Sequence, residues 1–234
     1  MTARLYLLDV EGTVAPISLV YEQLFPYARE RFAEFLKQNE WDAAVQADLA
    51  LLAEENSGEP DAPRMKISAH FDQAVEYLHW LMDRDRKSTA LKSLQGRIWK
   101  TGFESGALKG TLFADVPAAL ERWGKHARTA IYSSGSVDAQ RLLFRYSTFG
   151  DLTARIAAYF DTRTGPKTAS ASYVAIAAAM GVERAQVIFF SDVVRELDPA
   201  REAGLETRLV VREGNAPVAD AHGHEIINSF DHVN

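Results

Sequence analysis

Four short apolar runs, separated by segments with helical periodicity, constrain the fold of this chain more than any other feature. Runs that are short and apolar throughout are typical of strands buried on both faces of a parallel sheet. Helical patterns lie between the last three runs, and this alternation favours an α/β protein with a doubly wound parallel sheet. The runs are Leu5 to Val10, Thr129 to Tyr132, Val187 to Phe190 and Thr207 to Val211, with Ala158 to Phe160 as a candidate for a further short strand.

The stretch between the first two runs departs from this alternation. From Leu19 to Leu108 no convincing strand pattern is present, and apolar residues recur every three or four positions, as on one face of an amphipathic helix. We therefore expect a sheet domain formed by residues 1–18 and 109–234 and an inserted all-helical domain formed by residues 19–108. Because the insertion follows the strand that carries Asp9, we expect it to act as a cap over that edge of the sheet.

Composition excludes several classes of function. The chain has 234 residues, of which 47% are hydrophobic and 25% are charged, as in an ordinary globular protein. Its net charge is −6 and it has no cluster of Lys and Arg, so nucleic acid and anionic membranes are not expected partners. The absence of cysteine excludes disulfides, thiolate catalysis and cysteine-bound zinc. No signal peptide or membrane-spanning run is recognisable, so we expect a cytoplasmic protein.

Two carboxylates follow the first apolar run, in the segment Asp9-Val10-Glu11-Gly12-Thr13. Ligands of open α/β sheets bind beyond the carboxyl ends of the strands, so Asp9 is placed at a candidate site. Carboxylates two residues apart can share one divalent cation, and one of them can attack phosphorus once that cation shields its charge. Asp and Gly are also common turn residues, so this segment taken alone leaves a plain surface turn open.

Hydroxyl groups follow the second run, and a lysine precedes a later helix pattern. Ser133 and Ser134 lie between a predicted strand and a predicted helix, where hydroxyls and backbone N–H groups can cradle a phosphate; capping of the helix by Ser134 or Ser136 is the alternative. Lys167 follows a Gly-Pro turn at the expected start of a helix that runs to Met180, a position where the helix dipole disfavours a cation. A bound anion would explain this lysine, although a solvated lysine is the commoner case.

An acid also ends the third run. Asp192 follows the run directly, and Glu196 lies four residues further on. If the first and third runs are neighbouring strands, Asp192 faces Asp9, and their oxygens with Glu11, waters and a phosphate suit Mg²⁺. Glu196 could orient a metal-bound water. An N-cap role for Asp192 and a plain surface charge at Glu196 are the alternatives, but the four segments together form a specific pattern of acid, hydroxyl, lysine and acid.

This order of motifs resembles the haloacid dehalogenase superfamily of phosphohydrolases along nearly the whole chain. Glu11 stands where the superfamily usually has a second Asp. That substitution, together with the segments Pro16 to Ser18 and Leu24 to Ala28, looks like the enolase-phosphatase E1 family of methionine salvage. The resemblance implies a Rossmann-like core with a helical cap, Mg²⁺ as the cofactor, and a monomer that acts on a small phosphorylated molecule.

The resemblance also implies roles for the candidate residues. Asp9 is expected to attack phosphorus and form an aspartyl-phosphate. Glu11 is expected to protonate the leaving alcohol and then to activate the hydrolytic water. The metal is expected to be held by Asp9, Asp192 and the backbone carbonyl of Glu11. The residues expected to bind the phosphoryl oxygens are Ser133, Ser134 and Lys167.

The family's substrate is 2,3-diketo-5-methylthiopentyl-1-phosphate, which is enolised and then dephosphorylated to the acireductone 1,2-dihydroxy-3-keto-5-methylthiopentene. Glu11 is one candidate for removing the carbon-bound proton, and Lys100 is a weaker one. Two alternatives stay open. The chain could be another phosphatase or a phosphomutase of the superfamily acting on a sugar phosphate, or a catalytically silent module that binds phosphate.

Overall fold

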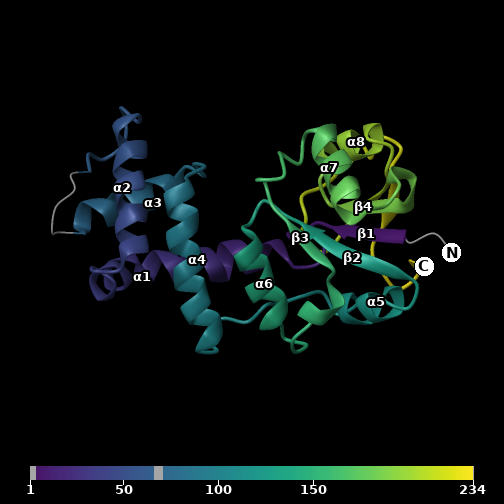
Figure 1. Ribbon diagram of the computed structural model, residues 1–234, viewed down its shortest axis with the longest axis horizontal. Coiled ribbons are helices and arrows are strands. Elements are labelled where there is room, and N and C mark those ends of the chain that lie inside the picture. Colours follow the sequence, from purple (N-terminus) through teal and green to yellow (C-terminus); the bar gives the residue numbers. More distant parts are fainter. Residues whose placement is uncertain (1–3, 66–70, 234) are drawn as a thin grey trace. The chain divides into compact units, whose positions relative to one another are not determined.

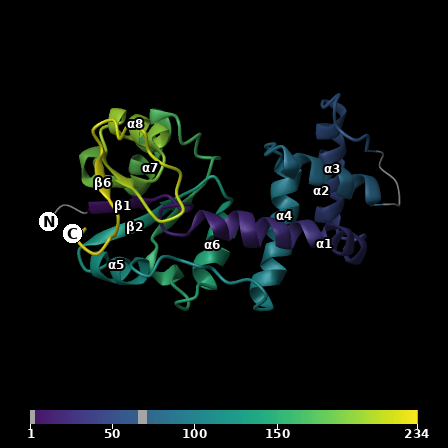
Figure 2. The same ribbon diagram turned by 180° about the vertical axis from the view of Figure 1, so that it is seen from behind.

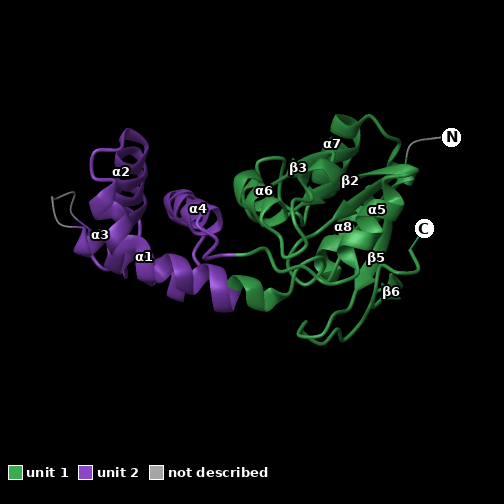
Figure 3. Ribbon diagram, turned by 90° about the horizontal axis from the view of Figure 1, so that it is seen from below, with its two compact units in different colours: residues 1–20, 109–234 green, residues 21–108 purple. Residues whose placement is uncertain are grey.

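The structure, a computed structural model, describes residues 4–65 and 71–233. The chain forms two compact units, one made of residues 1–20 and 109–234 and the other of residues 21–108 (Figure 3). The predicted boundaries lay after residues 18 and 108, whereas the units part after Val20 and Leu108. Each unit has its own buried apolar core.

The first unit contains a six-stranded sheet in the order β3-β2-β1-β4-β5-β6 (Figure 1). Every neighbouring pair of strands is parallel. Because β1 lies between β2 and β4, the residues that follow these three strands emerge side by side at one edge. The strands are β1 (Arg4–Leu8), β2 (Ala127–Tyr132), β3 (Ala158–Phe160), β4 (Val187–Ser191), β5 (Glu206–Val210) and β6 (Glu225–Ile227).

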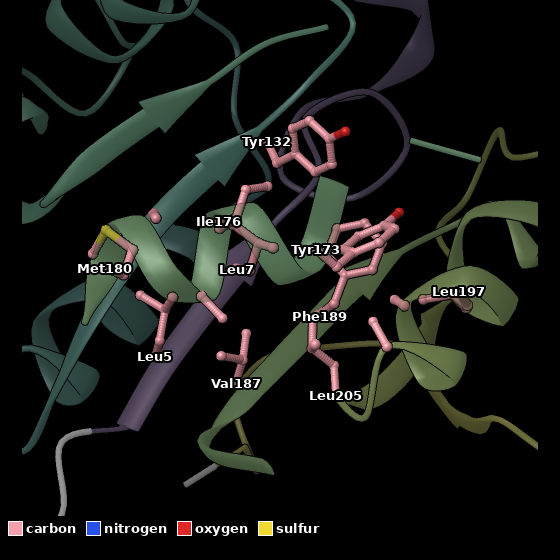
Figure 4. Packing of buried hydrophobic residues seen from close by; sticks show 14 of the residues in the cluster. Leu5, Leu7, Tyr132, Tyr173, Ile176, Met180, Val187, Phe189, Leu197 and Leu205 are labelled. Carbon is pink, nitrogen blue, oxygen red and sulfur yellow. The ribbon is translucent and has the colours of Figure 1, made fainter. Parts of the chain in front are cut away.

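Helices cover both faces of this sheet, so the predicted doubly wound fold is confirmed. Alternate side chains of β1 point to opposite faces, as the pleat of a strand requires. Leu5 and Leu7 belong to a buried cluster (Figure 4) shared with α7 (Ser170–Met180) and α8 (Val194–Glu202). Tyr6 faces the other way and stacks on Trp123, with ring centroids 4.4 Å apart.

The helix that carries Trp123 is α5 (Val116–Trp123), which lies on the face opposite α7 and α8 in both Figure 1 and Figure 2. A further helix, α6 (Val137–Arg145), packs beside β3. These helices leave the carboxyl edge of the strands to loops, which is where the predicted site residues lie.

Strand β1 ends at Leu8 and not at Val10 as predicted, because the chain turns immediately after it. The backbone N–H groups of Thr13, Val14 and Ala15 all donate to the Val10 carbonyl, at 2.9 to 3.2 Å. Because Val10 is apolar but lies in this turn, the apolar run in the sequence extends beyond the end of the strand.

Two other elements differ from the sequence-based prediction. Helix α7 begins at Ser170, and Lys167 lies in the turn before it, because the Pro166 carbonyl first closes a turn with Ala169 N–H at 3.0 Å. The predicted end of α7 at Gly181 is confirmed, since this glycine has φ 60° and closes the helix in the left-handed conformation. The edge strand β6 was not predicted, because it is too short to show a periodic pattern.

The second unit is all-helical over its described residues, as predicted. Its core is formed by fully buried side chains such as Phe32, Leu52 and Leu94. A π-helical turn (Leu19–Leu24) leads into it, and its helices are α1 (Phe25–Gln38), α2 (Ala43–Ser57), α3 (Asp72–Asp83) and α4 (Thr89–Glu104). Across the described parts of both units, no helix combines the length and the apolar character that a membrane span needs.

Candidate active site

Three of the predicted segments meet at the carboxyl ends of adjacent strands. Asp9 follows β1, Ser133 follows β2 and Asp192 follows β4. The sheet's hydrogen bonding continues into these loops, since Asp9 N–H donates to the carbonyl of Phe190 at 2.9 Å and Ser133 N–H donates to that of Phe160 at 3.2 Å. The backbone positions of the site are therefore extensions of the sheet and share its rigidity.

A buried ammonium joins the first strand end to helix α8. Lys167 Nζ lies 2.5 Å from Asp9 Oδ1 and 2.5 Å from Glu196 Oε2, and the Lys167 side chain is only 8% exposed. The Tyr173 hydroxyl lies 2.7 Å from the Lys167 carbonyl oxygen and 2.9 Å from that of Glu196. Tyr173 thus anchors the backbone on both sides of the ion pair, so the ammonium is held toward Asp9.

Negative charge exceeds positive charge in the cluster around Lys167. Burial alone would lower the pKa of the Lys167 ammonium, but Asp9 and Glu196 raise it above its ordinary value, so Lys167 stays protonated. Burial raises the pKa of the Asp9 carboxyl; the charge of Lys167 opposes this effect, and the charges of Glu196 and Glu11 add to it. Burial and the nearby Glu196 raise the pKa of Asp192 to about 6. One ammonium therefore faces several carboxylates.

Ser133 connects the end of β2 to Glu11. Its hydroxyl lies 3.3 Å from Glu11 Oε2 and accepts a hydrogen bond from the N–H of Gly135 at 3.0 Å. Ser134 is exposed in the same turn, and it is Ser136 that caps α6 by accepting a backbone N–H at 3.2 Å. Helix capping therefore accounts for Ser136 but not for Ser133, whose hydroxyl is directed at the second acid of the first motif.

Asp192 packs against the glycine of the first motif. Gly12 has φ 70°, a left-handed conformation that glycine adopts without strain. A Cβ atom on Gly12 would lie 2.2 Å from Asp192 Oδ2, so no larger residue fits there without displacing the carboxylate. The glycine thus lets the acid that follows β4 approach the loop that follows β1.

This arrangement fits a magnesium ion. Proteins usually bind Mg²⁺ through one or two carboxylates, with waters and substrate phosphate oxygens filling the octahedron. Asp9 and Asp192 offer two such carboxylates from adjacent strand ends, and the surplus negative charge of the cluster is what a divalent cation neutralises. In the described part of the chain no three acidic or histidine side chains form a metal site by themselves. The third ligand, the backbone carbonyl of Glu11, stays a prediction, and the Glu11 carboxylate itself is directed to Ser133.

Sequence reasoning missed three residues beside the site. Ser191 Oγ lies 3.0 Å from Glu196 Oε2 and 3.5 Å from Asp9 Oδ2. Asn215 donates from Nδ2 to the Gly12 carbonyl at 2.9 Å. Sequence reasoning could have found both, because ligands bind beyond the carboxyl ends of strands. Ser191 is the last residue of β4, and Asn215 lies in the loop after β5. The third is Tyr173, which lies within a helix and shows no such signal.

Two predicted residues have surroundings that the sequence did not indicate. Glu196, expected to orient a metal-bound water, lies against Lys167 and Ser191. Lys100, the weaker candidate for proton removal, forms an exposed ion pair with Glu104 one helical turn away, with Nζ and Oε1 2.5 Å apart. The contacts of Glu196 therefore hold the Lys167 ammonium in place, and its orientation of a metal-bound water stays a prediction.

Known proteins resemble the chain along almost its whole length. A family model described as haloacid dehalogenase-like hydrolase matches residues 3–204. An enolase-phosphatase E1 from Synechococcus elongatus is 52% identical over 230 residues, covering 97% of this chain and 96% of that protein. A second enolase-phosphatase E1, from Leptospira borgpetersenii, is 43% identical over 235 residues, covering 100% of both chains.

A solved structure shows the same similarity in three dimensions. The crystal structure of the UTR4 protein from Saccharomyces cerevisiae superposes with a TM-score of 0.81 at 36% sequence identity. The match covers 99% of this chain and 100% of that one. A sheet-containing fold of this kind is therefore found in an experimentally determined protein.

Proposed function

The chain belongs to the enolase-phosphatase E1 family of the haloacid dehalogenase-like hydrolases, and we propose that it catalyses that family's reaction in methionine salvage. It is a phosphatase of phosphoric monoesters. The proposed substrate is 2,3-diketo-5-methylthiopentyl-1-phosphate, and the proposed product is the acireductone 1,2-dihydroxy-3-keto-5-methylthiopentene. The observation that carries the proposal is the Lys167 ammonium, held 2.5 Å from both Asp9 and Glu196 at the edge of the sheet.

Asp9 is the proposed nucleophile. One carboxylate oxygen attacks phosphorus in line with the leaving oxygen, and an aspartyl-phosphate forms. The backbone hydrogen bond to Phe190 and the contact with Lys167 hold the carboxylate in one position, which lowers the entropic part of the barrier. Mg²⁺, bound by Asp9, Asp192 and the Glu11 carbonyl, would offset the repulsion between the attacking and phosphoryl oxygens.

Glu11 is the proposed acid and base. It gives a proton to the leaving oxygen when the aspartyl-phosphate forms and takes one from the water that hydrolyses it. The Ser133 hydroxyl, 3.3 Å from Glu11 Oε2, restricts the orientation of this carboxylate. Glu11 is also the proposed base for the enolisation, because its side chain lies at the same sheet edge as Asp9.

The phosphoryl group is proposed to bind between Lys167 and the loop after β2. Lys167 is buried and stays charged, so it stabilises negative charge that develops on the phosphoryl oxygens. Ser133 and the exposed Ser134 follow a strand and precede α6, where backbone N–H groups add further donors. The helical unit is proposed to act as the cap.

A substrate panel tests this function. The purified protein is incubated with the diketone phosphate, with p-nitrophenyl phosphate and with hexose phosphates, each with and without Mg²⁺, while enolisation and phosphate release are followed separately. We expect Mg²⁺-dependent release of phosphate and a clear preference for the diketone.

Other outcomes assign the chain differently. A preference for a hexose phosphate would indicate another phosphatase of the superfamily, and transfer of phosphate between two positions of one sugar would indicate a phosphomutase. Phosphate binding without turnover of any compound would indicate a silent binding module.

A further inference from the structure

The side-chain amide of Asn215 ties together two strand ends that are not neighbours in the sheet. Asn215 lies in the loop after β5, and its Nδ2 group donates to the carbonyl of Gly12 at 2.9 Å and to that of Val210 at 3.4 Å. Val210 ends β5 and Gly12 lies in the loop after β1, while β4 lies between these strands. The amide therefore reaches across the end of β4, where Asp192 is found.

With this contact, both backbone polar groups of Gly12 are hydrogen-bonded. Its N–H donates to the Ala15 carbonyl at 2.8 Å, and its own carbonyl accepts from Asn215 at 2.9 Å. Gly12 directly follows Glu11 and is three residues from Asp9, so the same peptide segment sets the direction of the Glu11 carbonyl. A loop made flexible by its glycine is thereby held in one conformation.

The oxygen of the same amide lies close to Asp192. The position of a Cβ on Gly12 would be 3.1 Å from Asn215 Oδ1 and 2.2 Å from Asp192 Oδ2, so both oxygens lie against the same side of Gly12. Asn215 Oδ1 is buried and has no hydrogen-bond partner within the described structure. A buried acceptor without a donor is unfavourable, so a donor is expected there when the site is filled.

We propose that Asn215 is a positioning residue for the reaction proposed above. Its amide N–H group holds the Gly12 carbonyl, and hence the loop bearing Asp9 and Glu11. Its amide oxygen accepts a hydrogen bond from a water bound to the divalent cation beside Asp192. This inference rests on the proposed function, because it concerns the same catalytic loop.

Gln140 offers a matched comparison in the other catalytic loop. Its Nε2 group donates to the carbonyls of Gly135 and Phe160, at 2.8 and 2.9 Å, so it tethers the loop of Ser133 to the end of β3. Its oxygen is likewise buried without a partner in the described structure. Since this loop is proposed to bind phosphate and not metal, loss of the Gln140 tether should have a different kinetic signature.

The test compares Asn215→Leu, Asn215→Asp and Gln140→Leu in the full chain. Affinity for Mg²⁺ is measured by calorimetric titration with magnesium chloride alone, and kcat and KM are measured with p-nitrophenyl phosphate and the diketone phosphate. For Asn215→Leu we expect Mg²⁺ affinity to fall about 10-fold or more and kcat at saturating Mg²⁺ to fall with KM nearly unchanged. For Gln140→Leu we expect KM to rise while Mg²⁺ affinity is retained.

Asn215→Asp separates the two halves of the proposal. Aspartate keeps an acceptor oxygen but loses the donor, so Mg²⁺ affinity should be retained while kcat falls. Thermal unfolding without metal reports whether each variant is folded. Wild-type Mg²⁺ affinity and kcat in a folded Asn215→Leu variant, with or without a lower Tm, would overturn the proposal and leave Asn215 a purely structural residue.

Failure of the proposed function gives a different result. If the wild-type protein releases no phosphate from either compound, the enzymatic assignment falls, and the Mg²⁺ titrations still decide whether Asn215 supports a metal site.

Discussion

Two ion pairs in the sheet-containing unit have charged side chains that are less than 10% exposed but differ in their surroundings. Lys167 and Asp9 are 8% and 4% exposed, with the charged atoms 2.5 Å apart. Arg212 and Asp115 are 6% and 9% exposed, with the charged atoms 2.8 Å apart. The charged atoms are thus similarly spaced in the two pairs, although Asp115 and Arg212 as whole residues are only partly buried and Asp9 and Lys167 are buried.

Three hydrogen-bond donors converge on one oxygen of Asp115, while its Oδ1 atom and the Nη2 atom of Arg212 are buried without a partner in the described structure. Besides Arg212, the Oδ2 atom of Asp115 accepts from the N–H of Phe230 at 2.7 Å and from the hydroxyl of Ser229 at 3.1 Å. Burial alone would raise the pKa of Asp115, but these donors hold it below its ordinary value. The Arg212 guanidinium lies over the Phe230 ring, 4.7 Å from its centroid, so the pair fastens the C-terminal segment to the start of α5.

The Asp9 pair shows the opposite balance. Glu196 and Glu11 add negative charge around one ammonium, and the pKa of Asp9 is raised and not lowered. Around Asp115 one guanidinium and two further donors meet a single carboxylate, whereas around Asp9 one ammonium meets several carboxylates, so a ligand that brings positive charge is favoured at Asp9. At these two pairs the direction of the carboxyl pKa follows the local balance between acids and hydrogen-bond donors.

The largest expected effect comes from Asp9→Asn. This change removes the nucleophile and one surplus negative charge, so phosphate release should fall by about 10⁴-fold or more while thermal stability without metal is kept or raised. Phosphate release and thermal unfolding measure the two effects. Near-normal turnover would show that Asp9 is not the nucleophile.

Lys167→Met should follow in size. The change leaves Asp9 and Glu196 without their shared cation and removes the group that stabilises charge on the phosphoryl oxygens, so kcat should fall by about 10²–10³-fold. Single-turnover measurements would separate this chemical effect from substrate binding. Retained kcat with only a lower Tm would make the Lys167 pair structural, like the Arg212 pair.

Asp115→Ala should affect stability and not chemistry. Arg212 would be left buried without its partner, and the free energy of unfolding should fall by about 3–5 kcal/mol, measured in urea. At a temperature where the variant is folded, kcat should stay within a few-fold of the wild-type value. A loss of kcat comparable to that of Lys167→Met would contradict the distinction between the pairs.

The smallest effect is a difference in pH dependence, measured without metal. The pKa of Asp115 is lowered, so its stabilisation is present above the unfolded value of about 3.9 and is lost as pH falls through the lower folded value. The pKa of Asp192 is raised to about 6, so its stabilisation is present below about 3.9 and is lost as pH rises through 6. Above pH 6 we therefore expect Asp115→Asn to lower Tm and Asp192→Asn to raise it. A change of Tm in the same direction for both variants would contradict this.

The sequence predicted the parts of the molecule that follow from local patterns. Continuous apolar runs predicted the four strands β1, β2, β4 and β5 and gave β3 as a candidate, and the acids, hydroxyl and lysine that follow strands identified the segments that the sheet brings together. The end of β1 and the start of α7 were misplaced because backbone turns, and not hydrophobicity, set them.

Other features could not be predicted because they depend on contacts between distant residues. The pairing of Lys167 with Glu196 requires α7 and α8 to be packed together, and the sequence alone shows both residues only as charges near helix starts. The hydrogen bonds of Asn215 link the ends of β5 and β1 across β4, so they become visible only once the strand order is known.

The central position of β1 has a consequence for how the chain folds in the cell. This strand precedes the whole helical unit, yet its two neighbours in the sheet, β2 and β4, follow that unit. During synthesis the apolar side chains of β1 stay unpaired until β2 and β4 have been made, while the helical unit can already fold from local contacts. Chaperone binding to the nascent chain should therefore concentrate on the first strand until β4 has emerged.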